Sequence, residues 1–277
     1  MTVKKKKLVG NIAYHCVAII FAFIIMFPFF WMLSTSLKGN GALLTIPIEI
    51  LPKAPTLDAY EKLFRTPSFV KSIFNSLYVA IFSTAVQLIT SSMAAYALTK
   101  IKFKGREALF KGFIATMMIP FQVIFIPLFI VMSKMNLTNN LSALVLLHLF
   151  APVAIFMLRQ KMMTIDDAYI EAATIDGASA FQIYRKIILP LCSGTLATLA
   201  VMAFMSSWND YLIPLVMLSD QEKYTLPLVL NGLEGQFLGE YNLMMAGSLI
   251  SIIPILILYI CMQKYFKEGL QVGGVKG

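Results

Sequence analysis

Six long apolar runs constrain the fold of this chain more than any other feature of its sequence. A helix needs about 20 mostly apolar residues to cross a bilayer, and only helices and closed barrels satisfy their backbone hydrogen bonds there. The sequence therefore predicts an all-α, polytopic membrane protein that forms one transmembrane domain over residues 1–277. Its six predicted spans are at about 10–33, 73–98, 110–132, 141–158, 191–218 and 243–262.

The composition supports a membrane protein and excludes other classes. Hydrophobic residues make up 58% of the chain and charged residues 13%, about half the charged share of a soluble domain (~25%). The net charge of +9 lies in short basic clusters beside the apolar runs, so we expect no nucleic-acid partner. Cys16, Cys192 and Cys261 lie far apart with no C-x-x-C spacing, which predicts neither a disulfide nor a metal site.

The distribution of basic residues predicts the orientation of the chain. With the N-terminus inside, sixteen of the 23 Lys and Arg residues fall on the cytoplasmic side and seven outside. Both termini, including a tail at 263–277, are expected in the cytoplasm. The first apolar run has no A-x-A-like end, so it is expected to stay as an uncleaved helix. We expect a multi-pass protein of the cell membrane, plasma or inner, surrounded by lipid.

A segment of mixed polarity, residues 164–190, interrupts the apolar pattern. Thr164 and Asp167 resemble a capping box with Asp in place of Glu, which predicts that a helix begins there. A stripe at helical spacing is expected to form its apolar face: Ile165, Ala168, Tyr169 and Ala172. Asp167 and Glu171 lie on another face, and two like charges four residues apart disfavour a helix, so they suggest a basic partner.

A turn and a second helix are predicted to follow. Gly177 stands where the first helix should end, since glycine enters the left-handed conformation most easily. Ser179 and Gln182 form a second capping box. Four apolar residues then recur at helical spacing: Phe181, Tyr184, Ile188 and Leu191. Amphipathicity alone leaves open whether this cytoplasmic helix–turn–helix grips another protein or lies in the lipid headgroups.

Seven residues of this segment reproduce the EAA signature of the permease subunits of binding-protein-dependent ABC importers: Glu171, Ala172, Ala173, Gly177, Ile187, Leu189 and Pro190. The chain thus resembles that family, and the resemblance implies the type I importer permease fold. In the family this segment is the coupling helix that sits in a cleft of the ATPase. The resemblance implies that the face bearing Asp167 and Glu171 meets the ATPase.

The resemblance narrows to the carbohydrate permeases, the maltose/maltodextrin-like group. It covers "NSLYVAIFSTAVQLITSSMAAYALTKIKFKG", "SSWNDYLIPLVML" and the tail "KYFKEGLQVGGVKG", whose Gly273, Gly274 and Lys276 are implied to contact the ATPase. It implies a heterodimer with a second related permease, two ATPase subunits, and an extracellular or periplasmic sugar-binding protein. The function it implies is import of a sugar or oligosaccharide by alternating access, driven by ATP hydrolysis on the partner subunits.

Catalytic chemistry is not expected in this chain. It has no G-x-x-x-x-G-K-[ST] phosphate loop and no catalytic spacing, so the resemblance implies that ATP and Mg are held by the partner ATPase subunits. We therefore expect a transporter subunit that is not an enzyme and holds no cofactor of its own.

Asp210 is the only acidic residue inside the predicted spans. With Trp208, Asn209 and Tyr211 it is a candidate for the substrate path, because intramembrane carboxylates usually face a cavity or a neighbouring helix. A hydrogen bond to another helix is the alternative for Asp210. The competing function, a secondary transporter or channel for a small polar solute, would need ion-coupling carboxylates or inverted repeats, and neither is visible.

Overall fold

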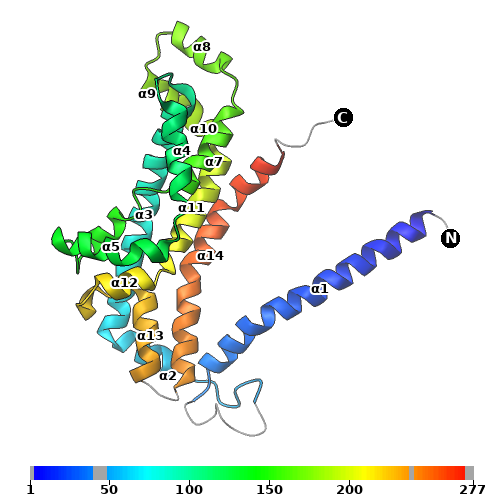
Figure 1. Cartoon of the computed structure of the whole chain (residues 1–277). Helices are drawn as coiled ribbons and strands as arrows, with labels where there is room; N and C mark the ends of the chain where they lie inside the picture. Colours follow the sequence, from blue (N-terminus) through cyan, green and yellow to red (C-terminus); the bar gives the residue numbers. More distant parts are fainter. Residues whose placement is uncertain (1–2, 40–48, 237–239, 272–277) are drawn as a thin grey trace. The chain divides into compact units, whose positions relative to one another are not determined.

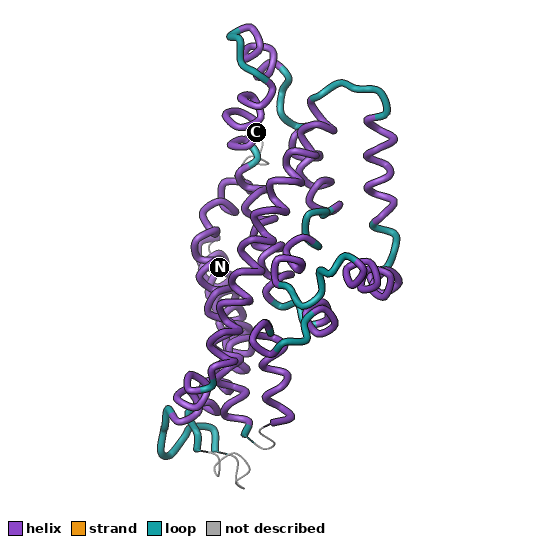
Figure 2. Tube along the Cα trace, turned by 90° about the vertical axis from the view of Figure 1, so that its left-hand side faces the viewer, coloured by secondary structure: helices purple, strands orange, loops and turns teal. Residues whose placement is uncertain are grey.

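The computed structural model describes residues 3–39, 49–236 and 240–271. Within those ranges all regular elements are helices, joined by loops (Figure 2). The chain divides into two compact units, one built from Met1–Phe69 and Leu230–Ile253, the other from Val70–Val229 and Pro254–Gly277. The predicted all-α fold is confirmed.

The elements follow one another in this order, and Figure 1 labels all of them except α6, η2 and η3: α1 Val3–Ser36, α2 Asp58–Arg65, α3 Pro67–Lys100, α4 Arg106–Thr116, α5 Phe121–Lys134, α6 Leu141–Leu146, α7 Pro152–Met163, α8 Ala168–Ile175, α9 Ala180–Ile183, a π-helix η2 Tyr184–Ile188, α10 Leu189–Leu191, α11 Ser193–Trp208, α12 Leu212–Met217, a 3-10 turn η3 Gln221–Lys223, α13 Leu226–Gln236 and α14 Tyr241–Gln271.

Three of the described helices are long and apolar enough to cross a membrane: Tyr14–Ser36, Pro67–Lys100 and Tyr241–Tyr265. Two bent pairs raise the number to five if each pair is one span: α4 with α5, bent by 98°, and Ala180–Leu191 with α11, bent by 80°. Figure 1 shows α5 lying across the direction of α4. The predicted count of six spans is not confirmed.

Proline explains where two of the predicted spans break. The run at 141–158 forms two helices, α6 and α7, and α7 begins at Pro152 after Ala151, whose backbone is not helical. The bend between α4 and α5 ends at Pro120, which directly precedes α5. Because a proline ring disfavours helical backbone in the preceding residue, a continuous helix stops before each of these positions.

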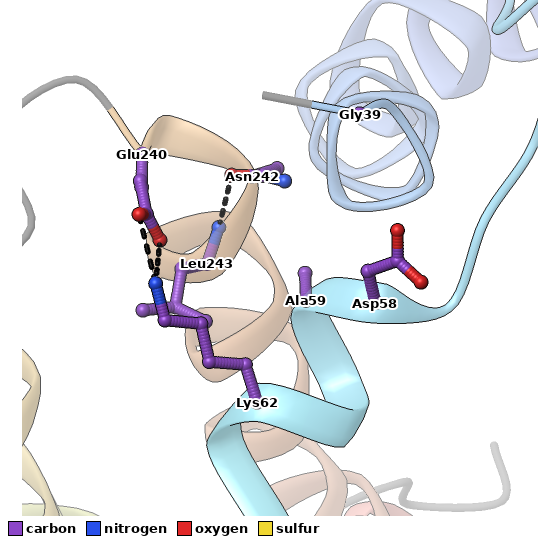
Figure 3. A pocket seen from close by; sticks show the side chains of 7 residues that line it. All are labelled: Gly39, Asp58, Ala59, Lys62, Glu240, Asn242 and Leu243. Carbon is purple, nitrogen blue, oxygen red and sulfur yellow. Dashed lines mark hydrogen bonds and ion pairs between the residues drawn. The ribbon is translucent and has the colours of Figure 1, made fainter. Parts of the chain in front are cut away.

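The first unit packs α2 against the first turns of α14. Lys62 Nζ donates to both carboxylate oxygens of Glu240, at 2.8 and 2.6 Å (Figure 3). Asn242 Nδ2 donates to the Lys38 carbonyl at 3.0 Å. A cavity of about 290 Å³ lies beside this ion pair. Further along α14, a Cβ on Gly247 would lie 2.5 Å from Leu230 Cδ2, so the Leu230 side chain would have to shift to admit a larger residue.

The second unit has its main core beneath segment 164–190. This core brings together residues of α3, α7, α8, α9, η2 and α11, with Leu158, Met162 and Ile188 fully buried. Two tyrosine hydroxyls form hydrogen bonds inside it: that of Tyr184 with Ser92 Oγ at 2.8 Å, and that of Tyr96 with the Ala180 carbonyl at 3.1 Å. Segment 164–190 is therefore anchored on its buried side, and its outer side is exposed.

Candidate functional site

The start of segment 164–190 differs from the prediction. Thr164 ends α7, where its hydroxyl donates to the Lys161 carbonyl at 2.8 Å, and it caps no helix. The next helix, α8, begins at Ala168, whose N–H is accepted by Asp166 Oδ1 at 3.0 Å. The predicted Thr164–Asp167 capping box is wrong, because Asp166 makes a shorter local turn to the backbone two residues ahead.

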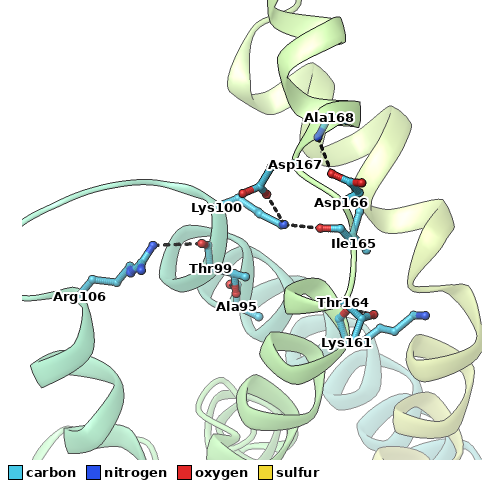
Figure 4. A network of polar contacts seen from close by, with 10 residues as sticks. All are labelled: Ala95, Thr99, Lys100, Arg106, Lys161, Thr164, Ile165, Asp166, Asp167 and Ala168. Carbon is cyan, nitrogen blue, oxygen red and sulfur yellow. Dashed lines mark hydrogen bonds and ion pairs between the residues drawn. The ribbon is translucent and has the colours of Figure 1, made fainter.

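Lys100 holds this junction from the end of α3 (Figure 4). Its Nζ donates to the Ile165 carbonyl at 2.7 Å and to Asp167 Oδ1 at 2.6 Å. The Lys100 side chain is 6% exposed and that of Asp167 is 73% exposed. The hydrogen bond and the charge of Lys100 lower the pKa of the Asp167 carboxyl below its usual value. A lysine at the last position of α3 also suits the negative end of the helix dipole.

This contact changes the interpretation of the acidic face. We expected Asp167 and Glu171 to meet a basic partner together, but Asp167 already has a basic partner within its own chain. Glu171 is exposed, and among the described residues it forms no ion pair. Both carboxylates are exposed, and Asp167 differs from Glu171 in already forming an ion pair with Lys100.

The buried face of α8 also differs from the prediction. Ala173 is 9% exposed and Ile170 packs against the same core, whereas Ala168, Tyr169 and Ala172 are exposed. Of the predicted stripe, only Ile165 is buried. The reason is that α8 begins at Ala168 and Ile165 lies in the preceding loop, so the four residues do not share one helix.

The turn at Gly177 confirms the prediction. Gly177 has φ +78°. The Ala178 N–H bonds the Ala173 carbonyl at 2.9 Å, and the Gly177 N–H bonds the Thr174 carbonyl at 3.0 Å, the two hydrogen bonds of a Schellman motif. A Cβ at Gly177 would meet no atom within 4 Å. Glycine is thus favoured by backbone conformation and not by lack of space.

The second helix begins as predicted. The Gln182 N–H bonds Ser179 Oγ at 3.4 Å, and the Ser179 N–H bonds Gln182 Oε1 at 2.7 Å, which completes the capping box. The expected apolar stripe is half confirmed, because Tyr184 and Ile188 are buried but Phe181 is 59% and Leu191 44% exposed.

A π-helix explains this change of face. The Leu189 N–H bonds the Tyr184 carbonyl, five residues back, and the widened turn shifts the pattern of the residues around it. Pro190, which has no N–H to give to the carbonyl four residues back, follows directly. The other two signature residues here, Ile187 and Leu189, are half-buried.

The predicted substrate-path residues lie at and beyond the end of α11. Trp208 is 1% exposed and stacks on Phe204, with ring centroids 5.8 Å apart. Asp210 Oδ1 accepts the Ile213 N–H at 3.3 Å, so it bonds the first turn of α12. Asn209 is exposed and Tyr211 half-buried. The other predicted contact residues, Gly273, Gly274 and Lys276, lie outside the described residues.

Sequence reasoning missed two buried cations on the same side of the second unit. One is Lys100. The other is Arg159, 8% exposed, whose Nη2 donates to Glu107 Oε1 at 2.5 Å and whose guanidinium lies 3.8 Å from the Phe110 ring centroid. In the sequence, both are recognisable only as basic residues beside predicted spans. Their partners lie 67 and 52 positions away, beyond the reach of local patterns.

Comparisons with known proteins agree with this architecture. Residues 87–272 match the family described as binding-protein-dependent transport system inner membrane component. The chain is 37% identical to the arabinooligosaccharides transport system permease protein AraQ of Halalkalibacterium halodurans, over 92% of this chain and 93% of the relative. It is 34% identical to the inner membrane ABC transporter permease protein YcjP of Escherichia coli, over 98% and 99% of the two chains.

A solved structure shows the same fold. A chain in the crystal structure of a bacterial ABC transporter involved in the import of the acidic polysaccharide alginate matches with a TM-score of 0.82 and 26% identity, covering 96% of this chain and 99% of that chain. The predicted importer permease fold is therefore confirmed, and the secondary transporter or channel is not supported. The chain belongs to the binding-protein-dependent transport system inner membrane component family, as a multi-pass membrane permease.

Proposed function

We propose that this chain is the permease subunit of an ABC importer for a sugar or oligosaccharide, and that segment 164–190 couples it to a separate ATPase subunit. The arabinooligosaccharide relative and the alginate importer support a carbohydrate substrate. Alternating access of the permease would be driven by hydrolysis of ATP, with Mg, on the partner.

The observation that carries the coupling role is the exposed face of α8. Tyr169 is 57% and Ile175 87% exposed there, beside the exposed Glu171 and Ala172. Apolar side chains exposed around a carboxylate fit a contact with another protein. The Schellman turn and the capping box then hold α8 at a defined angle to the helix that leads into α11.

The same face disfavours the alternative that α8 lies in the lipid headgroups. Interfacial helices are typically rich in Lys and Arg on their polar side, and the cytoplasmic leaflet is negatively charged. From Ala168 to Ile175 the chain has Glu171 and no basic residue. Docking on a protein with a basic cleft is the better explanation.

The full proposed assembly contains a second related permease, two ATPase subunits, and an extracellular or periplasmic sugar-binding protein. The family description supports dependence on a binding protein. We further propose that both termini are cytoplasmic and that the tail residues Gly273, Gly274 and Lys276 contact the ATPase. Trp208, Asn209, Asp210 and Tyr211 stay a proposal for the substrate path.

The coupling role is tested by Gly177→Val, with Gly105→Val as the matched control. Both glycines have positive φ, +78° and +87°, and open space around the missing Cβ. Each substitution therefore costs about 1 kcal/mol or more in backbone strain, but only one lies in the coupling segment. Glu171→Lys adds a charge reversal on the exposed face.

In the reconstituted importer, Gly177→Val and Glu171→Lys should insert normally and pair with the second permease. We expect them to retain the ATPase poorly and to lose substrate-stimulated ATP hydrolysis, whereas Gly105→Val should keep it. If both coupling variants hydrolyse ATP and transport sugar like the wild type, the coupling assignment is refuted.

A further inference from the structure

The second unit contains a cavity that lies far from the coupling segment and is lined by both aromatic and amide side chains. It has a volume of about 570 Å³, within the range of roughly 300–1,000 Å³ typical of small-molecule sites. Phe74, Asn75 and Tyr78 line it from the first turns of α3, with Asn139 and Asn140 before α6 and Lys223 on η3. These residues belong neither to the predicted substrate path nor to the EAA signature.

The register of α3 places this cavity on the opposite side of the membrane from the coupling segment. Asn75 and Lys100 are 25 residues apart on one helix, which spans about 37 Å at 1.5 Å per residue. The hydrocarbon core of a bilayer is about 30 Å thick. Since Lys100 binds the cytoplasmic coupling segment, the cavity lies at the external end.

Hydrogen bonds hold the three carboxamides that line the cavity in fixed orientations. Asn75 Nδ2 donates to the carbonyls of Glu222 and Tyr224, at 2.9 and 3.0 Å, so both of its N–H groups are used and Oδ1 stays available as an acceptor. A side chain fixed in this way binds a ligand without a further loss of rotational freedom.

Asn139 and Asn140 have the complementary arrangement. Asn139 Oδ1 accepts the N–H groups of Ser219 and Asp220, at 3.4 and 3.2 Å, and Asn140 Oδ1 accepts the Ser142 N–H at 2.9 Å. Within the described part of the chain, neither Nδ2 donates a hydrogen bond. The cavity thus combines fixed donors with a fixed acceptor, which is the pair of functions that a sugar hydroxyl satisfies at once.

Two aromatic rings complete the lining. Phe74 is 66% exposed and Tyr78 38%, and the Tyr78 hydroxyl is held by Ser142 Oγ at 3.0 Å. The face of such a ring matches the apolar C–H face of a sugar ring, while the amides match its hydroxyls. Lipid would be a poor occupant, because amides and an ammonium group are costly to expose to hydrocarbon.

The charge of the lining favours an uncharged ligand. Lys223 is the only charged residue that lines the cavity within the described chain, and its Nζ lies 3.9 Å from Asp220 Oδ2, which offsets its charge. A polyanionic ligand would find only Lys223 as a positive charge in this lining, and that charge is already paired with Asp220.

We propose that this cavity is an external subsite for a neutral oligosaccharide, at which the permease itself contacts its substrate. The inference rests on the proposed function for the substrate class. It assigns Phe74 as the stacking surface, Asn75 as the acceptor, and Asn139 and Asn140 as the donors.

Direct binding tests the subsite without relying on transport. The assembled permease complex in lipid nanodiscs, with no binding protein, is mixed with neutral trisaccharides (arabinotriose, maltotriose and raffinose), and binding is followed by saturation-transfer NMR. We expect binding of at least one, a decrease of fivefold or more in Phe74→Ala and Asn140→Ala, and near-wild-type binding in Phe74→Trp. Ile89→Ala, at another exposed α3 position, 56% exposed, serves as the control and should bind normally.

Three outcomes overturn the subsite: no binding of any trisaccharide to the wild type, unchanged binding in both alanine variants, or tighter binding of a trisaccharide of uronic acids. ATP hydrolysis stimulated by sugar-loaded binding protein is measured in parallel. If that stimulation is present while trisaccharide binding is absent, only the subsite fails. If no sugar stimulates hydrolysis, the proposed function fails.

Discussion

Replacing Lys100 by methionine should loosen the junction between α7 and α8, where segment 164–190 begins. Methionine keeps a long apolar stem and removes the ammonium group, which lies 2.7 Å from the Ile165 carbonyl in a side chain that is 6% exposed. A hydrogen bond from a buried charged donor contributes about 1.5–3 kcal/mol. A change of about 1.4 kcal/mol corresponds to a factor of ten in an equilibrium constant. Loss of this hydrogen bond should therefore shift the equilibrium toward an open junction, in which Ile165 is no longer bound to α3, roughly 10- to 150-fold.

The Asp167 contact should add little to this effect, because Asp167 is mostly exposed to water and surface ion pairs are weak. Its lowered pKa gives the sign of any pH dependence. The stabilisation is complete above the usual carboxyl pKa and is lost as the pH falls through the lowered value, so it is fully present at neutral pH.

Hydrogen–deuterium exchange of the whole importer measures this prediction. Amides of α8 in Lys100→Met should exchange about tenfold faster or more, with a smaller change in Asp167→Asn. Lys102→Met removes an exposed lysine two residues away and should leave the exchange unchanged. Wild-type exchange in Lys100→Met, or an equal effect in Asp167→Asn, would refute the argument from burial.

Three further predictions concern other parts of the chain. In a cysteine-free background, an impermeant thiol reagent should label a cysteine at Pro55 in intact cells, and one at Lys104 only after permeabilisation; the reverse result would invert the topology. Deleting Gln271–Gly277 should lower transport at an unchanged membrane level of the protein, and full transport would show that the tail is dispensable. Gly247→Leu should destabilise the first unit by about 1–3 kcal/mol, because a side chain there overlaps Leu230; an unchanged melting temperature, with Gly232→Leu at an open position as the control, would contradict this close approach.

The features predicted correctly from the sequence depend on neighbouring residues. The turn at Gly177 and the Ser179 capping box involve residues at most five positions apart, so their physical chemistry is contained in a short stretch. The seven-residue signature identified the family for the same reason. The helical class followed from the length of the apolar runs alone.

The features that the sequence did not predict depend on distant residues or on helix breaks. The contact between Lys100 and Asp167 was not predicted, because no local pattern connects two residues 67 positions apart. The predicted count of six spans is not confirmed; hydropathy measures the length of an apolar run and ignores its direction, so it gives no sign of a bend of 98°. The stripe of α8 failed because its helix begins three residues later than Ile165.

The π-helix at Tyr184–Ile188 determines how the helix–turn–helix is rotated relative to the residues that follow it. Its i→i+5 turn absorbs one extra residue, and each residue of an α-helix turns the chain by about 100°, so straightening this turn to α geometry with every residue kept would rotate everything before it by about that angle relative to the residues that follow. The helix–turn–helix would keep all of its own hydrogen bonds and yet present Glu171 in a different direction. The π-helix thus determines the direction in which the helix–turn–helix presents Glu171, although the spacing between Gly177 and Pro190 stays the same.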